Sequence, residues 1–545
     1  MVDKSKQKII QKCSKFAIGG IPGHRPQEHL FTAKSVISLY EYLDIPLFLQ
    51  TFDISKYFDR EILRDAMDSL FEAGITGKLY RLWFMMNKDS QICVKTGFGM
   101  TDTAPTGENV AQGSIGGGII SALNLDKTVG GHFKGADSEV SYGTTRLSPL
   151  LYQDDAMNFS TSVEGAQKSN ILMGQAIKMK QLNLNVDKCA AVVFGRKKKV
   201  EKIRKFIQDN RSLSINGLEV KLKTEEKYLG DYFHSGGLAK SVEATVNKRF
   251  GAALNSIIEL KCVVDDFRMH TLGGLISGLD IFNLAIFPAL MYNSETWLSI
   301  SKKTIERLDD LQNILMRCLL AVPKSAPTPA LNWDLGVLSM EHKINEKKLM
   351  FFHYISTLDE SYLVKEIFTI QKKFSFPGFV PEFRGLIHLY GLPDILDSAN
   401  LITKPRWAIL VKEAIRKKYE DELRNEMTSG HSGKGYSKLK ASKLIDEKFG
   451  LKDYFKQMSL VDARTHFRLR CSITNTVKMN QKSNPEYARK LWLCDDCGNV
   501  DSQSHIMWCP SYATLREELD INNDVDVVHY FQRVLKLREE LKSDE

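Results

Sequence analysis

The chain has 545 residues, of which 43% are hydrophobic and 26% charged, and its formal net charge is +9. This length exceeds what one hydrophobic core organises, so we expect three or four domains, and the basic excess suits a polyanionic partner. Nine cysteines without regular pairing argue against a secreted disulfide scaffold and favour a reducing intracellular compartment, the nucleus or the cytoplasm.

The N-terminal part of the chain predicts a loop, a helix, a strand and a second helix. Residues 16–28 are rich in Gly and Pro, residues 30–44 have a helical pattern, and Leu47–Phe52 form a short apolar run that ends at Asp53. The helix that follows carries one apolar stripe, with Gly74 as its C-cap; the stripe consists of Ile62, Leu63, Ala66, Met67, Leu70 and Phe71.

The next part of the chain predicts a hairpin. Residues 100–118 form a Gly/Thr-rich loop that leads into an apolar helix from Ile119. Two short apolar runs, Leu150–Tyr152 and Ala156–Phe159, predict strands around a tight turn at Gln153-Asp154-Asp155.

Beyond the hairpin the pattern becomes increasingly helical. We expect a helix whose apolar side consists of Leu172, Met173, Ala176, Ile177 and Met179. A strand over Ala190–Phe194 and then a basic run, Arg196–Lys199, follow it, and we expect the basic run on a loop. Residues 30–235 therefore predict an α+β fold around an antiparallel sheet. Residues 236–480 have an almost wholly helical pattern.

One apolar stretch, Leu272–Tyr292, is long enough to suggest a membrane span. It contains Asp280, Asn283 and Pro288, and such polar groups are costly in lipid. We therefore expect buried helices here and no membrane partner.

The hairpin turn carries two adjacent carboxylates, Asp154 and Asp155, with apolar residues on either side. Burying such a pair is costly unless a cation neutralises it. With Asp53 as a third carboxylate, the pattern predicts a site for two divalent metals, and Mg²⁺ is favoured because its preferred ligands are oxygens. The alternative is that Asp-Asp marks an ordinary exposed turn.

Five stretches, in this order, resemble motifs of reverse transcriptases. Phe52–Asp59 (FDISKYFD) resembles the first palm motif, Gln112-Gly113-Ser114 the second, and Tyr152-Gln153-Asp154-Asp155 the Tyr-x-Asp-Asp hairpin. Leu184–Lys188 resembles the Asn-Pro-Asp-Lys stretch of the non-LTR branch, and Lys227–Gly230 resembles the primer-grip strand. The chain thus looks similar to the polymerase portion of a non-LTR retrotransposon protein.

This resemblance implies a right-hand polymerase that is an RNA-directed DNA polymerase. Its expected partners are an RNA template, a DNA primer or target, and deoxynucleoside triphosphates. The implied parts are a fingers remnant (1–45), a palm (46–235), a helical thumb (236–345), a helical linker (346–480), a zinc knuckle (481–520) and a charged tail (521–545). Fingers motifs usual before the first palm motif are missing, so we expect a truncated copy; the alternative is an inactive or co-opted nucleic-acid-binding protein.

The resemblance also implies roles at the catalytic centre. Asp53 and Asp154 would bridge two Mg²⁺ ions, with Asp155 as the outer ligand and the Ile54 carbonyl as a further oxygen. Phe58 would be the steric gate that excludes a 2′-hydroxyl. The alternative for Phe58 is an ordinary core residue at a helix start.

Further roles concern the triphosphate, the template and the primer. Lys188 would protonate the leaving pyrophosphate or hold its charge, and its alternative is a solvated surface lysine. Arg25, Gln112, Gly113 and Tyr152 would contact nucleotide or template. Tyr228, Leu229 and Gly230 would form the primer grip, and the alternative there is a plain edge strand.

Near the C-terminus, Cys494-x2-Cys497-x7-His505-x3-Cys509 has the spacing of zinc ligands. Four such ligands imply one structural Zn²⁺. We expect the knuckle to grip nucleic acid, helped by Trp492 and Trp508 and by upstream cations; these cations are Lys478, Lys482, Arg489 and Lys490. The alternative is that zinc only holds together a small module with little core.

Three arginines precede the knuckle at helical spacing. Arg464, Arg468 and Arg470 predict either a phosphate-binding face or a solvated cationic face.

Overall fold

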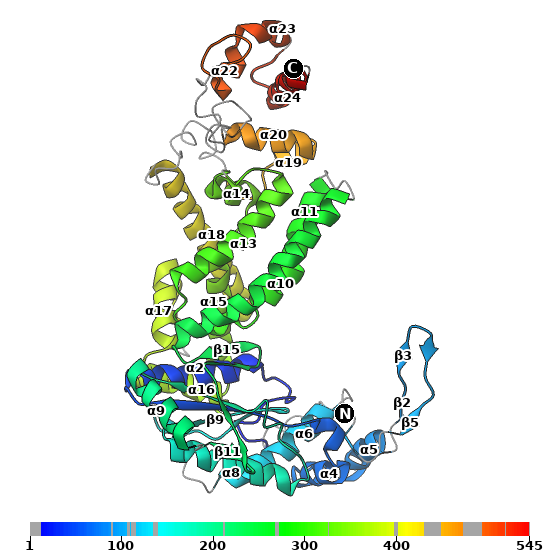
Figure 1. Ribbon diagram of the computed structural model, residues 1–545, viewed down its shortest axis with the longest axis vertical. Coiled ribbons are helices and arrows are strands. Elements are labelled where there is room, and N and C mark those ends of the chain that lie inside the picture. Colours follow the sequence, from blue (N-terminus) through cyan, green and yellow to red (C-terminus); the bar gives the residue numbers. More distant parts are fainter. Residues whose placement is uncertain are drawn as a thin grey trace. The chain divides into compact units, whose positions relative to one another are not determined.

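The computed structural model describes residues 12–543 except 89–90, 106–108, 111–115, 135–139, 211–212, 267–271, 325, 397–401, 430–447, 472, 474–492 and 518. The chain divides into two compact units that alternate along the sequence (Figure 1). Unit 1 comprises Met1–Lys248, Tyr292–Ser301 and Lys347–Ala408, and unit 2 comprises Arg249–Met291, Lys302–Glu346 and Ile409–Glu545.

Unit 1 is built on a five-stranded sheet with the order β13-β10-β1-β9-β8. Its middle strand, β1 (Leu47–Asp53), is buried along nearly its whole length and pairs antiparallel with both β10 (Ala190–Phe194) and β9 (Asp155–Ser160). β1 is mainly apolar, and its polar residues Gln50 and Thr51 are buried too, which suits a strand covered on both faces. β8 (Leu150–Tyr152) pairs antiparallel with β9, so four of the five strands form the predicted antiparallel sheet. The edge strand β13 (Lys221–Leu222) departs from the prediction, because it is parallel to β10.

Two long helices lie on opposite faces of this sheet. α2 (Pro26–Tyr42) lies on one face and α8 (Val163–Met179) on the other (Figure 1). Pro26 at the start of α2 has a backbone angle suited to the first helical turn, and the Ser162 side chain caps α8 by accepting from the Gly165 amide. These local signals fix where both helices begin.

The basic run after β10 is not on a loop, contrary to the prediction. It opens the amphipathic helix α9 (Lys197–Asn210). Arg196 Nε lies 3.0 Å from Asp44 Oδ1, and Lys199 Nζ lies 2.9 Å from Asp44 Oδ2. The hydrogen bond from Lys199 is the main cause that lowers the pKa of Asp44. Lys197 Nζ also lies 4.0 Å from Glu201 Oε1, so three of the four basic residues of the run have a partner within the protein.

The remaining elements of unit 1 are short hairpins and connecting helices. The hairpin strands are β2 (Gln91–Ile92), β3 (Lys95–Thr96), β4 (Gly99–Met100), β5 (Ala104–Pro105), β6 (Ser141–Tyr142), β7 (Thr145–Arg146), β11 (Ser214–Ile215), β12 (Leu218–Glu219), β14 (Glu225–Tyr228) and β15 (Asp231–His234). The helices are α3 (Tyr57–Arg60), α4 (Leu63–Glu72), α5 (Gly77–Asn87), α6 (Gly117–Leu125), η1 (Asp126–Gly130), α7 (Gly131–Phe133), η3 (Ser294–Thr296), α16 (Leu363–Phe374) and α17 (Phe379–Tyr390).

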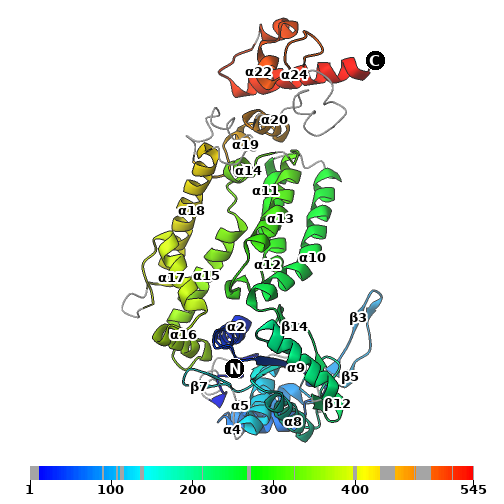
Figure 2. The same cartoon turned by 60° about the vertical axis from the view of Figure 1, so that its left-hand side comes forward.

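Unit 2 is helical, as the pattern predicted. Three helices run through both units, namely α10 (Leu238–Asp266), α15 (Met340–Thr357) and α18 (Lys404–Ser429). The others are α11 (Leu272–Ile281), η2 (Phe282–Ile286), α12 (Phe287–Leu290), α13 (Lys302–Leu320), α14 (Thr328–Leu335), α19 (Tyr454–Gln457), α20 (Leu460–Arg470), α22 (Gln503–Trp508), η8 (Pro510–Tyr512), α23 (Ala513–Arg516) and α24 (Asp524–Ser543). α11 packs beside α13 (Figure 2).

The helical run Leu272–Leu290 was expected to be buried, and this was wrong in extent. It is long and apolar enough to cross a membrane, and only 28% of it is buried. Gly278 packs closely against Leu319 of α13, whereas Leu284 is 80% exposed. That the run stays out of a membrane remains a prediction.

Candidate active site and candidate metal centre

The predicted acidic residues lie at a tight hairpin turn, Tyr152–Asp155, which we call the acidic turn. The register pairs Tyr152 with Asp155 and leaves Gln153 and Asp154 as the two connecting residues. Gln153 has a φ of 56°. Left-handed backbone of this kind is what two-residue hairpin turns use to match the twist of their strands.

The sheet brings Asp53 to the same place. The β1–β9 register sets Asp53 directly opposite Asp155, and side chains of opposed residues lie about 5 Å apart at Cβ. Partial burial, followed by repulsion from Asp154 and Asp53, raises the pKa of Asp155 to about 6. The three carboxylates thus concentrate negative charge at one end of the sheet, and a set of carboxylate oxygens is the donor chemistry that Mg²⁺ prefers.

The loop after α8 lies along the backbone around Asp53. The amide of Asn185 donates to the Asp53 carbonyl at 2.9 Å, and the amide of Ser55 donates to the Asn183 carbonyl at 2.8 Å. Ile54, between them, has its side chain in the core. Lys188 Nζ lies 3.5 Å from Asp53 Oδ2 and its side chain is 67% exposed. The structure therefore places Lys188 beside the carboxylates with its ammonium open to solvent.

Phe58 lies at the start of α3, half-buried between two apolar clusters. Its ring meets the Tyr57 ring edge-on at 5.6 Å. The Tyr57 hydroxyl donates to the Ser121 carbonyl at 2.9 Å and to Glu61 at 3.2 Å. Phe58 is thus held by a neighbour that is itself fixed to α6.

A buried polar network behind Phe58 was missed by the sequence reasoning. The Glu61 carboxylate, 1% exposed, accepts from the Ser121 hydroxyl and from Asn124 Nδ2, and burial raises its pKa. Glu61 directly follows α3, and Ser121 and Asn124 lie in α6, so the sequence gives no signal that they are in contact. The network joins the first motif to α6, the helix that follows Gln112-Gly113-Ser114, which lies outside the described residues.

The predicted primer grip is the turn of the β14–β15 hairpin. Leu229 and Gly230 have φ angles of 46° and 93°, and a Cβ on Gly230 would lie 3.0 Å from the Tyr292 ring. The Tyr228 side chain is buried, with its hydroxyl 3.2 Å from His29 Nδ1 and 3.5 Å from the Leu150 carbonyl. Tyr228 therefore joins the hairpin to α2 and β8.

Arg25 lies at the start of α2, and Tyr152 lies in the acidic turn. The Arg25 guanidinium carbon is 3.9 Å from the centre of the Tyr354 ring, and the Tyr354 hydroxyl donates to Glu28 at 2.6 Å. The half-buried Tyr152 ring meets His29 edge-on at 6.2 Å. Arg25 is exposed and stacks on an aromatic ring, so its described side-chain contact is within the protein.

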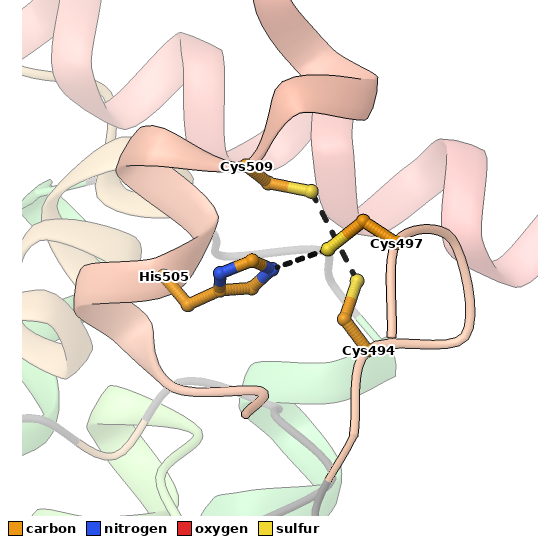
Figure 3. A group of neighbouring side chains, drawn as sticks. All are labelled: Cys494, Cys497, His505 and Cys509. Carbon is orange, nitrogen blue, oxygen red and sulfur yellow. Dashed lines mark hydrogen bonds between the residues drawn. The ribbon is translucent and has the colours of Figure 1, made fainter. Parts of the chain in front are cut away.

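The four predicted zinc ligands come together in unit 2 (Figure 3). One ligand atom from each of Cys494, Cys497, His505 and Cys509 lies within 4.8 Å of all the others. The Gly498 amide donates to the Cys494 carbonyl at 2.8 Å, which closes the knuckle turn, and α22 presents His505. Three thiols and one imidazole without an open position fit a structural Zn²⁺.

The last helix, α24, packs on the core around the Cys/His cluster, and together they form what we call the Cys/His module. The expected separate charged tail (521–545) is therefore not observed. Arg538 of α24 lies 3.0 Å from Asp501, whose side chain is fully buried, and 3.3 Å from Cys494 Sγ. Tyr530, Phe531 and Val534 pack on the same core as the cysteines; that core also holds Ile506 and Tyr512. Burial raises the pKa of the Cys494 thiol, and the nearby Arg538 guanidinium opposes this shift.

The arginines of α20 are structural, which corrects both expectations for them. Arg464, 9% exposed, donates to the Leu319 carbonyl at 2.8 Å, and Arg468 donates to the Ala321 carbonyl. Arg470 lies 3.4 Å from the buried carboxylate of Asp334. These groups bind the C-terminal end of α13 and the helix α14. Trp508 is 66% exposed, and the other residues proposed for nucleic-acid grip lie outside the described residues; these are Lys478, Lys482, Arg489, Lys490 and Trp492.

No family model matches this sequence, and no curated protein matches it significantly. An apo telomerase from Candida tropicalis is 10% identical with a TM-score of 0.34, covering 80% of this chain and 60% of that one. A telomerase from Candida albicans, solved with a fragment of telomeric RNA, is 14% identical with a TM-score of 0.29, covering 68% and 57%. The chain thus spans about three fifths of the length of these telomerase chains. Likeness at this level is too weak to assign a function.

Proposed function

We propose that this chain is an RNA-directed DNA polymerase of the non-LTR retrotransposon type. The observation that carries the proposal is the β1–β9 register, which sets Asp53 opposite Asp155 although the strands are far apart in sequence. The five ordered motifs supply the reaction class. The proposed substrates are deoxynucleoside triphosphates, an RNA template and a DNA primer, in the nucleus or cytoplasm.

The three carboxylates would hold two Mg²⁺ ions. When bound, such ions lower the pKa of a primer 3′-hydroxyl and neutralise the charge on the triphosphate. Asp53 and Asp155 stand on adjacent strands of a buried sheet, so their separation is fixed by backbone hydrogen bonds rather than by flexible loops. Asp154 adds a third acid from the turn itself.

Other residues would orient the reactants. Lys188, whose Nζ lies 3.5 Å from Asp53 Oδ2, would hold negative charge that develops on pyrophosphate. Phe58, fixed by Tyr57 and α6, would exclude a ribose 2′-hydroxyl. The turn at Leu229-Gly230 would support the primer end, because Tyr228 and Tyr292 pack beneath it.

Primer extension on poly(rA)/oligo(dT) with Mg²⁺ tests the proposal. Asp154→Asn and Asp53→Asn each remove one proposed metal ligand. Each should raise the activation free energy by about 3 kcal/mol and lower the rate by about 150-fold. Asp102→Asn, an exposed acid in the β4–β5 connection, is the matched control and should keep wild-type activity. Equal signals from wild type and Asp154→Asn would refute polymerase activity and leave the nucleic-acid-binding alternative. A preference for a DNA template would refute the RNA-directed assignment.

A further inference from the structure

The loop that precedes α2 lies along β8 and reaches the acidic turn. β8 is the last strand of the sheet, and its free edge is occupied by the loop that precedes α2. The Leu151 amide donates to the Phe16 carbonyl at 2.8 Å, and the Ile18 amide donates to the Leu151 carbonyl at 3.1 Å. This loop therefore follows β8 toward the turn and satisfies backbone groups that an open edge would expose.

At the turn the loop approaches too closely for any side chain. A Cβ on Gly19 would lie 2.1 Å from the Gln153 amide nitrogen and 2.5 Å from the Tyr152 carbonyl carbon. Gly20 has a φ of +78°, and its Cβ would lie 2.6 Å from the Gly118 carbonyl oxygen. All these contacts are with backbone, which cannot rotate away as a side-chain end does.

The two glycines thus touch two different parts of the site. Gly19 lies against the acidic turn, and Gly20 lies against the first turn of α6. Gln153 connects them, since its Nε2 would be 3.3 Å from a Cβ on Gly118. We propose that Gly19 and Gly20 form a backbone clamp that positions the acidic turn for metal binding; its catalytic consequence rests on the proposed function.

The turn has physical reasons to move if this clamp is loosened. Gln153 is held in left-handed backbone, which is unfavourable for a residue with a side chain. Asp154 and Asp53 both repel Asp155. A Cβ on Gly19 would lie 2.1 Å from the Gln153 nitrogen, and an ordinary contact is at least 3.4 Å, so the two segments would have to move apart by 1.3 Å. A misplacement of about 1 Å at a reacting centre costs about a hundredfold in rate.

The test uses the full chain with Gly19→Ala. Electron paramagnetic resonance measures the affinity for Mn²⁺ without any turnover. The part of this binding that Asp154→Asn removes is the binding at the acidic turn. We expect Gly19→Ala to weaken this Mn²⁺ binding by about tenfold or more and to lower kcat for primer extension by about a hundredfold. KM for primer–template should stay near the wild-type value, because the clamp does not touch the primer grip.

Two further glycines give matched comparisons. Gly131→Ala in α7 places its methyl group in open space and should leave Mn²⁺ affinity unchanged. Gly118→Ala meets the Gln153 side-chain end at 3.3 Å and the Gly20 Cα at an ordinary contact distance of 3.7 Å, so it should have a smaller effect than Gly19→Ala. If circular dichroism shows that Gly19→Ala does not fold, the same measurements are made on Gly20→Ala, with weakened Mn²⁺ binding as the expected result.

A folded Gly19→Ala or Gly20→Ala protein with wild-type Mn²⁺ affinity would overturn the clamp. A wild-type protein that binds no Mn²⁺ in an Asp154-dependent manner would overturn it as well. A wild-type protein that binds Mn²⁺ but extends no primer would refute the polymerase assignment alone, and weaker Mn²⁺ binding by Gly19→Ala would still support the clamp.

Discussion

The predicted primer grip depends on a buried ion pair, and Lys34→Met removes one half of it. Lys34 Nζ of α2 lies 2.6 Å from Asp231 Oδ2 in β15, and the two side chains are 3% and 2% exposed. Lys34 also donates to Thr296 at 2.9 Å. Breaking a buried pair from one side leaves a charge that water cannot reach, which costs about 3–5 kcal/mol. We expect unit 1 to lose that much free energy of unfolding.

Urea unfolding gives the free-energy change, and hydrogen–deuterium exchange locates it. Exchange should quicken first in α2 and in β14–β15, because Lys34 and Asp231 join these elements. Lys127→Met is the control: its pair with Glu72 is 46% and 59% exposed, so it should cost less than about 1 kcal/mol. Replacing both Lys34 and Asp231 with apolar residues should restore much of the loss. A Lys34→Met protein as stable as the Lys127→Met control would refute this reasoning.

Three further outcomes follow from the structure. Phe58→Ala should increase ribonucleotide incorporation relative to deoxynucleotide by about tenfold or more in primer extension, and an unchanged ratio would mean that Phe58 is only a core residue. Burial, then the nearby charge of His24, lowers the pKa of His29 to about 3. His29 therefore stays neutral in the folded state, whereas it gains a proton in the unfolded state below about pH 6.5. The free energy of unfolding should therefore decrease by about 2 kcal/mol as the pH is lowered from 7 to 5. His29→Phe should remove that drop in urea unfolding, and a drop of equal size in the variant would assign it to other groups. Cys497→Ser, or a chelator, should release one Zn²⁺ measurable by metal analysis and unfold residues 493–543 while exchange in unit 1 is unchanged; Cys93→Ser, at an exposed cysteine of unit 1, is the control.

The strands and helices around the acidic turn follow from short-range patterns. The strand over Ala190–Phe194 was predicted at its observed bounds, and β1 differs by one residue, because buried strands appear as short, mainly apolar runs between turn signals. The acidic turn was recognised because two adjacent acids interrupt such a run. The four zinc ligands were found for the same reason, since ligand spacing within one short segment is a local property.

Contacts between distant charged residues could not be predicted in this way. Arg538, in a segment expected to be a charged tail, reaches Asp501 and Cys494. Arg464 and Arg468 use their donors on backbone carbonyls at the end of another helix. In a sequence, an arginine that binds a carbonyl looks the same as one that faces water, and only the tertiary fold distinguishes them.

The close approach of Gly19 to the acidic turn has the same origin. Its neighbourhood reads as a Gly/Pro-rich loop, and that composition alone says only that the backbone is unusual. Which of the glycines is constrained depends on what lies against it, and at Gly19 this is a backbone segment from far along the chain.

Charge distinguishes between the two roles considered for the Cys/His module. Residues 493–545 contain twelve acidic and five basic side chains, whereas the whole chain has a net charge of +9. Affinity for nucleic acid comes largely from cations that neutralise phosphates, so a module with this excess of acids repels a phosphate backbone. One of its few cations, Arg538, is engaged with Asp501. The Cys/His cluster and the α24 core therefore favour a small fold held together by zinc for residues 493–543. Nucleic-acid grip by the cations upstream of the knuckle stays a prediction.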